Sequence, residues 1–287
     1  MVRLTPGILV GCRREGSYDP AMGPYTDLDR PPLSEQRLCR ALVVPGGLWT
    51  QLTVVAETSS TNADLIKAAR DGASEGAVRV AEQQTQGRGR LGRTWTSPAR
   101  AGIAMSVLLR PTVPASALGW LPLLAGVALA GAVRRVAEVD ADLKWPNDLL
   151  VGGRKCAGIL AEATPGAVVI GIGLNTTLRE HELPRPDTTS LQLAGAACFD
   201  RDPLLRAILR GLATWYGKWR DAGGNADACH LREAYRLHCA TLGRQVRVEL
   251  PGGDRIEGEA IDIDPDGRLI IGAARTPVAA GDVVHLR

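Results

Sequence analysis

The stretch GRGRLGRTW at residues 87–95 decides which kind of α/β fold this chain can adopt. Its first six residues match the G-x-G-x-x-G pattern of dinucleotide-binding folds, and a strand-like run at residues 78–81 precedes them. In those folds a helix follows, with its N-terminus facing a pyrophosphate, but the residues after Gly92 include Pro98 and cannot begin one. The sequence therefore argues against a dinucleotide-binding fold.

The same stretch combines three glycines with Arg88, Arg90 and Arg93. Guanidinium groups bind phosphate and carboxylate oxygens bidentately, and glycines let backbone amides approach a ligand. A solvated basic loop would have the same composition. The stretch therefore indicates a site for a polyanion only if other motifs support it.

A second motif, KWPND at residues 144–148, brings a lysine, an amide and a carboxylate together on a turn that a proline stiffens. Carboxylate and amide oxygens can hold Mg²⁺ beside a phosphate, and a lysine adds a point charge. Lys155 then leads into an apolar strand at residues 156–160. An ordinary turn with a surface lysine is the simpler explanation, but the chain has four lysines against 30 arginines and two of the four lie here. We therefore expect these lysines to serve chemistry.

The order and spacing of the motifs resemble those of the biotin protein ligases, which adenylate biotin and transfer it to a lysine of a carboxylase carrier domain. One motif could arise by chance, but five in the same order are specific. They cover the chain from about Leu52 to Asn175, and the C-terminal part resembles the SH3-like domain of the family. The motifs are SSTN at 59–62, EQQ at 82–84 with the stretch 87–95, KWPND at 144–148, RKCAGIL at 154–160 and GIGLN at 171–175.

The resemblance implies a role for each motif, and the ureido ring of biotin needs both hydrogen-bond donors and acceptors. The implied biotin-binding residues are Ser60, Thr61, Asn62, Gln84, Arg88, Gly89, Arg90, Lys155 and Gly158. The implied nucleotide-binding residues are Gly87, Arg88, Arg90, Arg93, Trp95, Lys144, Asn147 and Asn175. The implied catalytic residues are Arg90, Lys155, Lys144 and Asp148, and Asp148 is also the implied Mg²⁺ ligand.

The implied reaction uses ATP and Mg²⁺, with biotin and the biotin carboxyl carrier domain of acyl-CoA carboxylases as its substrates. It needs no protein nucleophile, because positioning and charge stabilisation carry the rate under a lid that excludes water. Two alternatives stay open: a lipoate-type ligase on the same scaffold and a bifunctional ligase and DNA-binding repressor. The polar residues 60–62 and Gln84 disfavour the dithiolane of lipoate.

Strand and helix patterns interleave without strict alternation, which predicts an α/β (α+β) fold with a mixed β-sheet flanked by helices. We expect strands at 52–56, 77–81, 103–109, 156–161 and 168–174, and helices at 33–44, 61–72 (capped by Thr61 and Asp64), 118–138, 203–220 and 226–239. After Leu242, short strands separated by Pro/Gly/Asp turns predict a small all-β barrel. The resemblance implies a partly flexible N-terminal extension at 1–48, a class II aminoacyl-tRNA synthetase-like catalytic domain at 49–240 and an SH3-like domain at 241–287.

The amino-acid composition bears on two questions: whether the protein binds nucleic acid, and in which cellular compartment it lies. The chain is 45% hydrophobic with a formal net charge of +3, which indicates a globular protein without the strongly basic surface of nucleic-acid binders. Residues 1–48 hold six prolines, six glycines and one helical pattern, so no helix-turn-helix and no specific DNA are expected. Six cysteines without a C-x-x-C pair, and no signal sequence, predict a cytoplasmic protein.

Two local features, an apolar run and two Cys/His pairs, resemble a membrane span and a zinc site, but we interpret both as ordinary parts of the fold. The apolar run at 117–133 is shorter than the roughly 20 residues of a bilayer span, so we expect a buried core helix and no membrane. The pairs Cys229-His230 and His238-Cys239 do not have the usual spacing of zinc ligands. A weak homodimer is compatible with the sequence.

Overall fold

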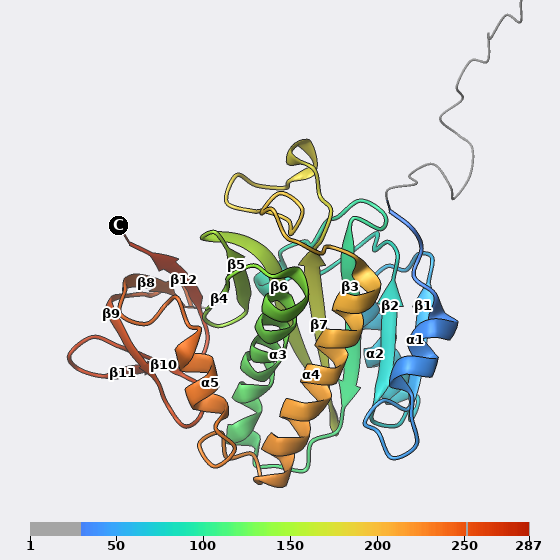
Figure 1. Cartoon of the computed structure of the whole chain (residues 1–287). Coiled ribbons are helices and arrows are strands. Elements are labelled where there is room, and N and C mark those ends of the chain that lie inside the picture. The colour runs from blue at the N-terminus through green and yellow to red at the C-terminus, as the bar shows by residue number, and fades with distance from the viewer. Residues whose placement is uncertain (1–29, 251, 287) are drawn as a thin grey trace, which may run out of the picture. The chain divides into compact units, whose positions relative to one another are not determined.

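A seven-stranded mixed sheet lies at the centre of the structure, a computed structural model that describes residues 30–250 and 252–286 (Figure 1). Its order is β1-β2-β3-β7-β6-β5-β4; β1 and β2 pair in parallel and the other neighbours pair antiparallel. The strands are β1 Gln51–Val55, β2 Ala77–Ala81, β3 Gly102–Leu109, β4 Ala141–Lys144, β5 Asp148–Val151, β6 Arg154–Thr164 and β7 Ala167–Asn175. The predicted mixed α/β fold is confirmed, but β4 and β5 were expected only as a turn.

Three helices cover one face of this sheet and one covers the other. In Figure 1, α3 (Trp120–Ala137) and α4 (Arg201–Asp221) lie side by side in front of the strands, and α2 (Thr61–Arg70) lies behind them. The short α1 (Glu35–Leu42) packs on β1 and α4, and α5 (Leu231–Leu237) packs on α3. Residues 1–29 of the expected N-terminal extension at 1–48 lie outside the described residues.

Two helix predictions need correction. Ser60, not Thr61, is the N-cap of α2, because its Oγ accepts a hydrogen bond from the backbone N–H of Ala63 and Thr61 is already helical. The helix expected at 226–239 begins only at Leu231, because Asn225 Oδ1 accepts from two backbone N–H groups and holds the preceding residues in a turn.

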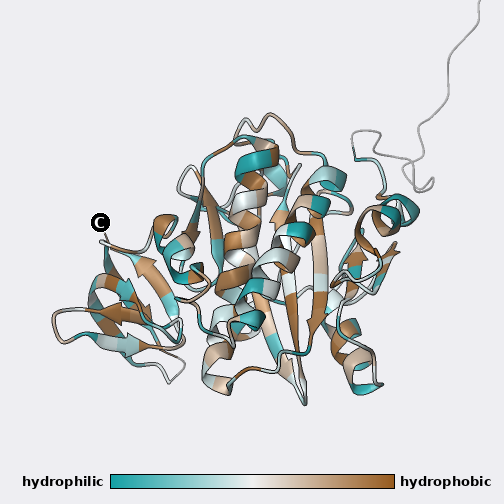
Figure 2. Cartoon of the chain, turned by 60° about the horizontal axis from the view of Figure 1, so that its bottom comes forward, coloured by the Kyte–Doolittle hydropathy of each residue, from teal (hydrophilic) through white to brown (hydrophobic). Residues whose placement is uncertain are grey.

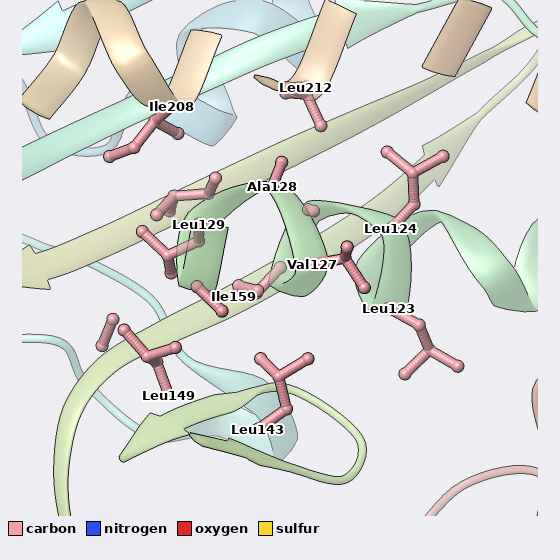
Figure 3. Close-up of a cluster of buried hydrophobic side chains, with 14 of the residues drawn as sticks. Leu123, Leu124, Val127, Ala128, Leu129, Leu143, Leu149, Ile159, Ile208 and Leu212 are labelled. Atoms are coloured by element: carbon pink, nitrogen blue, oxygen red, sulfur yellow. The ribbon is translucent and has the colours of Figure 1, made fainter. Parts of the chain in front are cut away.

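Helix α3 is the centre of the hydrophobic core. Figure 3 shows leucines of α3 and Val127 between α4 and the strands β4, β5 and β6. A helix that is apolar on all sides is stable when it is buried on all sides. Residues 115–137 are long and apolar enough to cross a membrane by composition, yet 67% of the most apolar 18-residue window in this segment is buried inside this fold. The predicted core helix is therefore confirmed.

The two faces of the central sheet differ in the size of their side chains. Side chains alternate along a strand, so Ile170 and Ile172 of β7 join the main core, whereas Val169 packs against Leu65 of α2 on the other face. Glycines follow Val169 on that second face. Figure 2 shows hydrophobic residues concentrated in the central strands, which is the pattern of a sheet covered on both sides.

A second sheet of five antiparallel strands follows, in the order β11-β10-β9-β8-β12. The strands are β8 Gln245–Glu249, β9 Arg255–Ile263, β10 Leu269–Ile271, β11 Thr276–Val278 and β12 Asp282–His285. The predicted all-β C-terminal region is confirmed, although β9 has nine residues where only short strands were expected.

Two buried tryptophans fasten this second sheet to the first. The indole N–H of Trp120 donates to the carbonyl oxygen of Pro265 (2.6 Å), and that of Trp145 donates to Gly267 (3.1 Å). Residues 32–287 accordingly group as one compact unit. The boundaries 49–240 and 241–287 stay a prediction.

Candidate functional site

A cavity of about 440 Å³ opens on the α2 side of the central sheet. Loops, the start of α2 and strands β4 to β7 meet around it, and together they carry almost every residue that the sequence singled out. The predicted residues on its lining are Ser60, Thr61, Asn62, Gln84, Arg88, Gly89, Arg90, Arg93, Trp95, Lys144, Asn147, Asp148, Lys155, Gly158 and Asn175. Gly87 is the exception: its carbonyl oxygen accepts from the backbone N–H of Trp95 (2.8 Å), so it closes the loop without lining the cavity.

Glycines on β6 and β7 make room for this cavity. A Cβ at Gly171 would lie 2.3 Å from Oδ1 of Asn62, and one at Gly173 would lie 2.4 Å from the ring of Trp95. Such distances are far below van der Waals contact. The glycines of the motif at 171–175 therefore let an amide and an indole lie directly on the sheet.

A hydrogen-bonded cluster forms one end of the cavity. Oε1 of Gln84 accepts from the backbone N–H of Thr61 (2.9 Å) and from its hydroxyl (3.1 Å). Ser106 Oγ lies 2.7 Å from Thr61 Oγ1 and 2.5 Å from Asn62 Oδ1. Ser106 was not predicted, although a single polar residue in the apolar strand 103–109 is a signal that could have found it.

The cluster continues to the arginine loop at 87–93 through Glu162 of β6. The side-chain amide of Asn62 donates to Glu162 Oε2 (2.7 Å) and to the carbonyl oxygen of Leu160 (3.3 Å). Glu162 Oε1 lies 3.3 Å from Nη1 of Arg88. Sequence reasoning missed Glu162, because its importance depends on the register of β6 against α2.

Two lysines and a carboxylate lie together elsewhere on the lining. Lys155 Nζ is 2.6 Å from Asp148 Oδ1 and 5.9 Å from the centre of the Trp95 ring. Burial lowers the pKa of Lys144, with Asp148 opposing this shift and Lys155 adding to it. The expected cluster of Lys144, Asp148 and Lys155 is therefore present, and its positive charges are partly desolvated.

The arginine loop folds back on itself and spans the gap between the two sheets. Its backbone is closed by a hydrogen bond from Gly89 N–H to the carbonyl oxygen of Arg93 (2.7 Å), and Gly92 adopts a positive φ of 72°. Arg90 donates to Asn147 Oδ1 and to the carbonyl oxygen of Gly281, both at 3.2 Å. Burial lowers the pKa of Arg90, partly opposed by the charge of Asp148.

Several lining residues were not predicted. Arg93 forms an ion pair with Asp282 of β12, and Glu249 of β8 also lines the cavity. Arg185 and Asp187 form a bidentate pair at 2.9 Å on a loop that runs along Lys155, whose backbone N–H donates to Asp187 (2.8 Å). No motif marks these residues, since the folded chain alone brings them to the cavity.

The oxygen atoms on the cavity lining suit a Mg²⁺ ion that is held partly by substrate phosphates, and they do not form a metal site built from protein ligands alone. Across residues 30–250 and 252–286, no three His, Cys, Asp or Glu side chains gather in a way that could hold a metal ion. Mg²⁺ commonly takes one or two carboxylates and completes its shell with waters and substrate phosphates. Asp148 and Asn147 are the neighbouring carboxylate and amide of that kind on this lining, and in this structure Asp148 Oδ1 pairs with Lys155 while Asn147 Oδ1 accepts from Arg90.

Comparison with known proteins agrees with this geometry. Residues 54–175 match the model of the biotin/lipoate A/B protein ligase family, and residues 241–286 match the biotin protein ligase C-terminal domain. The chain is 47% identical over 271 residues to the biotin–acetyl-CoA-carboxylase ligase of Mycobacterium tuberculosis, covering 91% of this chain and 100% of that relative. It is 34% identical to the bifunctional ligase/repressor BirA of Bacillus subtilis over 74% of this chain and 66% of that protein.

A solved structure leads to the same family. The biotin protein ligase from Aquifex aeolicus in complex with biotin and ATP superposes with a TM-score of 0.71 at 27% identity, covering 83% of this chain and 100% of that one. The family match includes the SSTN, arginine-loop, KWPND and GIGLN motifs, which line one cavity here. This chain belongs to the biotin protein ligases of the biotin/lipoate A/B protein ligase family.

Proposed function

We propose that this protein activates biotin with ATP to biotinyl-5′-AMP and transfers the biotinyl group to a specific lysine of a biotin carboxyl carrier domain. One observation carries the proposal: a single cavity joins a hydrogen-bonded cluster that suits a ureido ring to a set of cations that suits a carboxylate and phosphates. The similarity to named biotin ligases over most of the chain supports it.

The hydrogen-bonded cluster has fewer hydroxyl hydrogens than oxygen–oxygen contacts, which favours a ligand that donates N–H groups. The Ser106 hydroxyl has to donate to Asn62 Oδ1, because that amide oxygen carries no hydrogen. The Thr61 hydroxyl then donates either to Gln84 or to Ser106, so one of the two oxygen contacts lacks a hydrogen. The two N–H groups of a ureido ring fit this deficit, and the hydroxyl of Ser60 is a donor for its carbonyl oxygen.

The cations serve the first reaction step. We assign Lys155 and the arginine loop to the biotin carboxylate and the α-phosphate, and Lys144 to the phosphates. A carboxylate oxygen attacks the α-phosphorus of ATP, the bond to the bridging oxygen breaks, and pyrophosphate leaves. Fixed positive charges that face the reacting oxygens lower the barrier without having to reorganise. Asp148 and Asn147 would hold Mg²⁺, which supplies further charge neutralisation at the phosphates.

In the second step the acceptor lysine amine attacks the carbonyl carbon of the mixed anhydride. The new amide bond forms, the bond to the phosphate oxygen breaks, AMP leaves and the amine gives up a proton. Arg90 bridges Asn147 and the C-terminal sheet, which suits a loop that covers the anhydride and excludes water. Trp95 and Asn175, on the same lining, are assigned to the nucleotide.

A lipoate-type ligase is the second candidate, because the matched family includes both activities. A dithiolane ring donates no N–H group, so it would leave the cluster around Thr61 and Ser106 unsatisfied. Titration calorimetry with biotin and with lipoate distinguishes the two, and we expect heat of binding from biotin alone.

The proposed partners are the carrier domain, biotin and ATP, in the cytoplasm. The five cysteines among the described residues are free thiols, which suits a reducing compartment. One chain supplies every lining residue named above, so a weak homodimer is not needed to complete the cavity. Specific DNA is not among the proposed partners, since α1 is the single helix in the described part of the chain before β1.

Incubation of the protein with ATP, biotin and a carrier domain tests the function. Intact-mass measurement should show the carrier gaining one biotinyl group, and a carrier whose acceptor lysine is replaced by arginine should gain none. Modification by lipoate instead of biotin would favour the second candidate. No modification by either acid would contradict the proposal.

A further inference from the structure

Glu162 is the one acidic side chain that contacts both the hydrogen-bonded cluster and the arginine loop in the described structure. We infer that Glu162 is a positioning residue, through which occupation of the biotin pocket and ordering of the arginine loop strengthen each other. The inference rests on the proposed function and deepens it, because it concerns how the same site closes.

The two carboxylate oxygens of Glu162 have separate partners. Oε2 accepts from the side-chain amide of Asn62 at 2.7 Å, and Oε1 is 3.3 Å from Nη1 of Arg88. Glu162 is not among the residues that line the cavity. It acts on the site through its two neighbours.

The contact with Asn62 fixes which end of that amide faces the pocket. The Nδ2 group is held by Glu162 and by the carbonyl oxygen of Leu160, so Oδ1 has to face Ser106 and the cluster. Asn62 is 4% exposed and lies against Gly171, which leaves it little room to rotate. Glu162 therefore holds an acceptor of the proposed ureido site in position.

The contact with Arg88 anchors the beginning of the loop. Arg88 is 46% exposed on a glycine-rich segment, and its neighbours in the loop are further arginines, which repel it. The Glu162 side chain is 25% exposed, so the pair is screened less than a fully solvated one. The carboxylate therefore offsets part of the cost of ordering a loop of like charges.

These two contacts share one carboxylate, and coupling between two sites is reciprocal. A ligand that fixes Asn62 also fixes Glu162, which then presents its second oxygen to Arg88. A loop that is held through Arg88 in turn keeps Asn62 oriented for the ligand. Removing the charge of Glu162 should weaken biotin binding and loop ordering together.

The test uses Glu162→Gln, which keeps the shape of the side chain and an oxygen for Asn62 but presents no negative charge to Arg88. Limited trypsin digestion, followed by mass spectrometry of the cuts after Arg90 and Arg93, measures loop order with and without biotin. We expect biotin to slow these cuts in the parent protein. In Glu162→Gln that protection should fall at least about fivefold, with a matching rise in the biotin KM.

Two controls make the outcome specific. Glu257→Gln removes a strand glutamate that pairs with Arg247 on the C-terminal sheet, and it should leave biotin protection and KM unchanged. The loss of biotin affinity caused by Glu162→Gln should be smaller in an Arg88→Gln background than in the parent protein, because the contact between the two side chains is already broken there. Thermal unfolding of each variant reports whether the fold is kept.

Parental protection and parental KM in Glu162→Gln, or additive losses in the double variant, would overturn the inference. Such a result leaves the proposed function intact, provided the parent protein biotinylates the carrier domain. Failure of the parent to do so contradicts the function itself, so the two failures are distinguishable.

Discussion

The two faces of the central sheet use neighbouring residues of one strand for opposite purposes. On the α3 and α4 side, Ile170 of β7 is fully buried in the main core. On the other side, Gly171 leaves the space that Asn62 occupies at the cavity. One face gains free energy from large apolar side chains, and the other gives up that packing so that polar groups can approach the sheet. Stability and function should therefore respond to different substitutions in the same strand.

Ile170→Ala should produce the largest change and should affect stability alone. Removing a fully buried isoleucine leaves a cavity and is expected to lower the free energy of unfolding by about 3 kcal/mol. Urea denaturation measures this loss, and the KM for biotin should stay close to the parental value. A large rise in KM without loss of stability would show that the two faces are not independent.

Lys155→Arg should lower activity and leave stability nearly unchanged. The ammonium lies 2.6 Å from Asp148, and a larger planar guanidinium would displace the groups around it. A misplacement of about 1 Å at the reacting centre can cost roughly 100-fold, which single-turnover formation of biotinyl-AMP would measure. Lys67→Arg is the matched control, because that side chain is 82% exposed. A parental rate in Lys155→Arg would place the reacting carboxylate elsewhere.

Gly171→Ala tests the open face directly. The new Cβ would lie 2.3 Å from Asn62 Oδ1, so the amide has to move. Biotin affinity is expected to fall about tenfold, or 1.4 kcal/mol, in calorimetry. Gly131→Ala makes the same change on α3, where no atom lies within 4 Å of the new Cβ, and biotin affinity should be unchanged there. Equal effects of both substitutions would argue against a special role for the open face.

The smallest effect is a pH dependence of the free energy of unfolding, and it comes from His285 of β12, which lies near the turn after β4. Burial, with Lys144 and Arg244 nearby, lowers the pKa of His285 from 6.5 to about 4. Between these values the unfolded chain binds more protons, so stability is lost as the pH falls through this window. Because the imidazole is only partly buried, we expect a loss of about 1 kcal/mol.

His285→Gln should remove this part of the acid sensitivity. Unfolding midpoints of the two proteins at pH 7 and pH 4.5 provide the comparison. The Thr241 hydroxyl contacts His285 Nε2 at 3.1 Å and accepts a hydrogen bond from the backbone N–H of Trp145. The loss of stability at low pH should therefore extend to the KWPND turn. An unchanged pH dependence in the variant would assign the sensitivity to other groups.

Local patterns made much of this molecule predictable. The helices α1 to α4 and five strands of the central sheet follow from hydrophobic periodicity and turn residues, which act within a few positions of the chain. The site motifs could be recognised because each combines special residue types within four to fourteen positions. The hairpin of β4 and β5 was missed, since each strand has four residues and a motif with a chemical signature lies between them.

The neighbours of the motif residues could not be predicted in the same way. Ser106 meets Asn62 because β3 and β7 pair in one register, with Ser106 opposite Gly171. Asp282 meets Arg93 because the second sheet packs where Trp145 holds its β9–β10 turn. These contacts join residues more than 40 positions apart, and no local pattern fixes such distances.

The sequence by itself determined the chemical groups of the site, because lysine, arginine, amide and carboxylate side chains occur there in patterns that short-range rules and family resemblance can identify. Only the tertiary structure decided how they work together. Glycines at 158, 171 and 173 bring an amide and an indole onto the sheet, and Glu162 joins two motifs that lie 26 residues apart, Asn62 and Arg88. The reason is physical: residue type fixes charge and hydrogen-bonding capacity, whereas strand register and sheet packing fix distance.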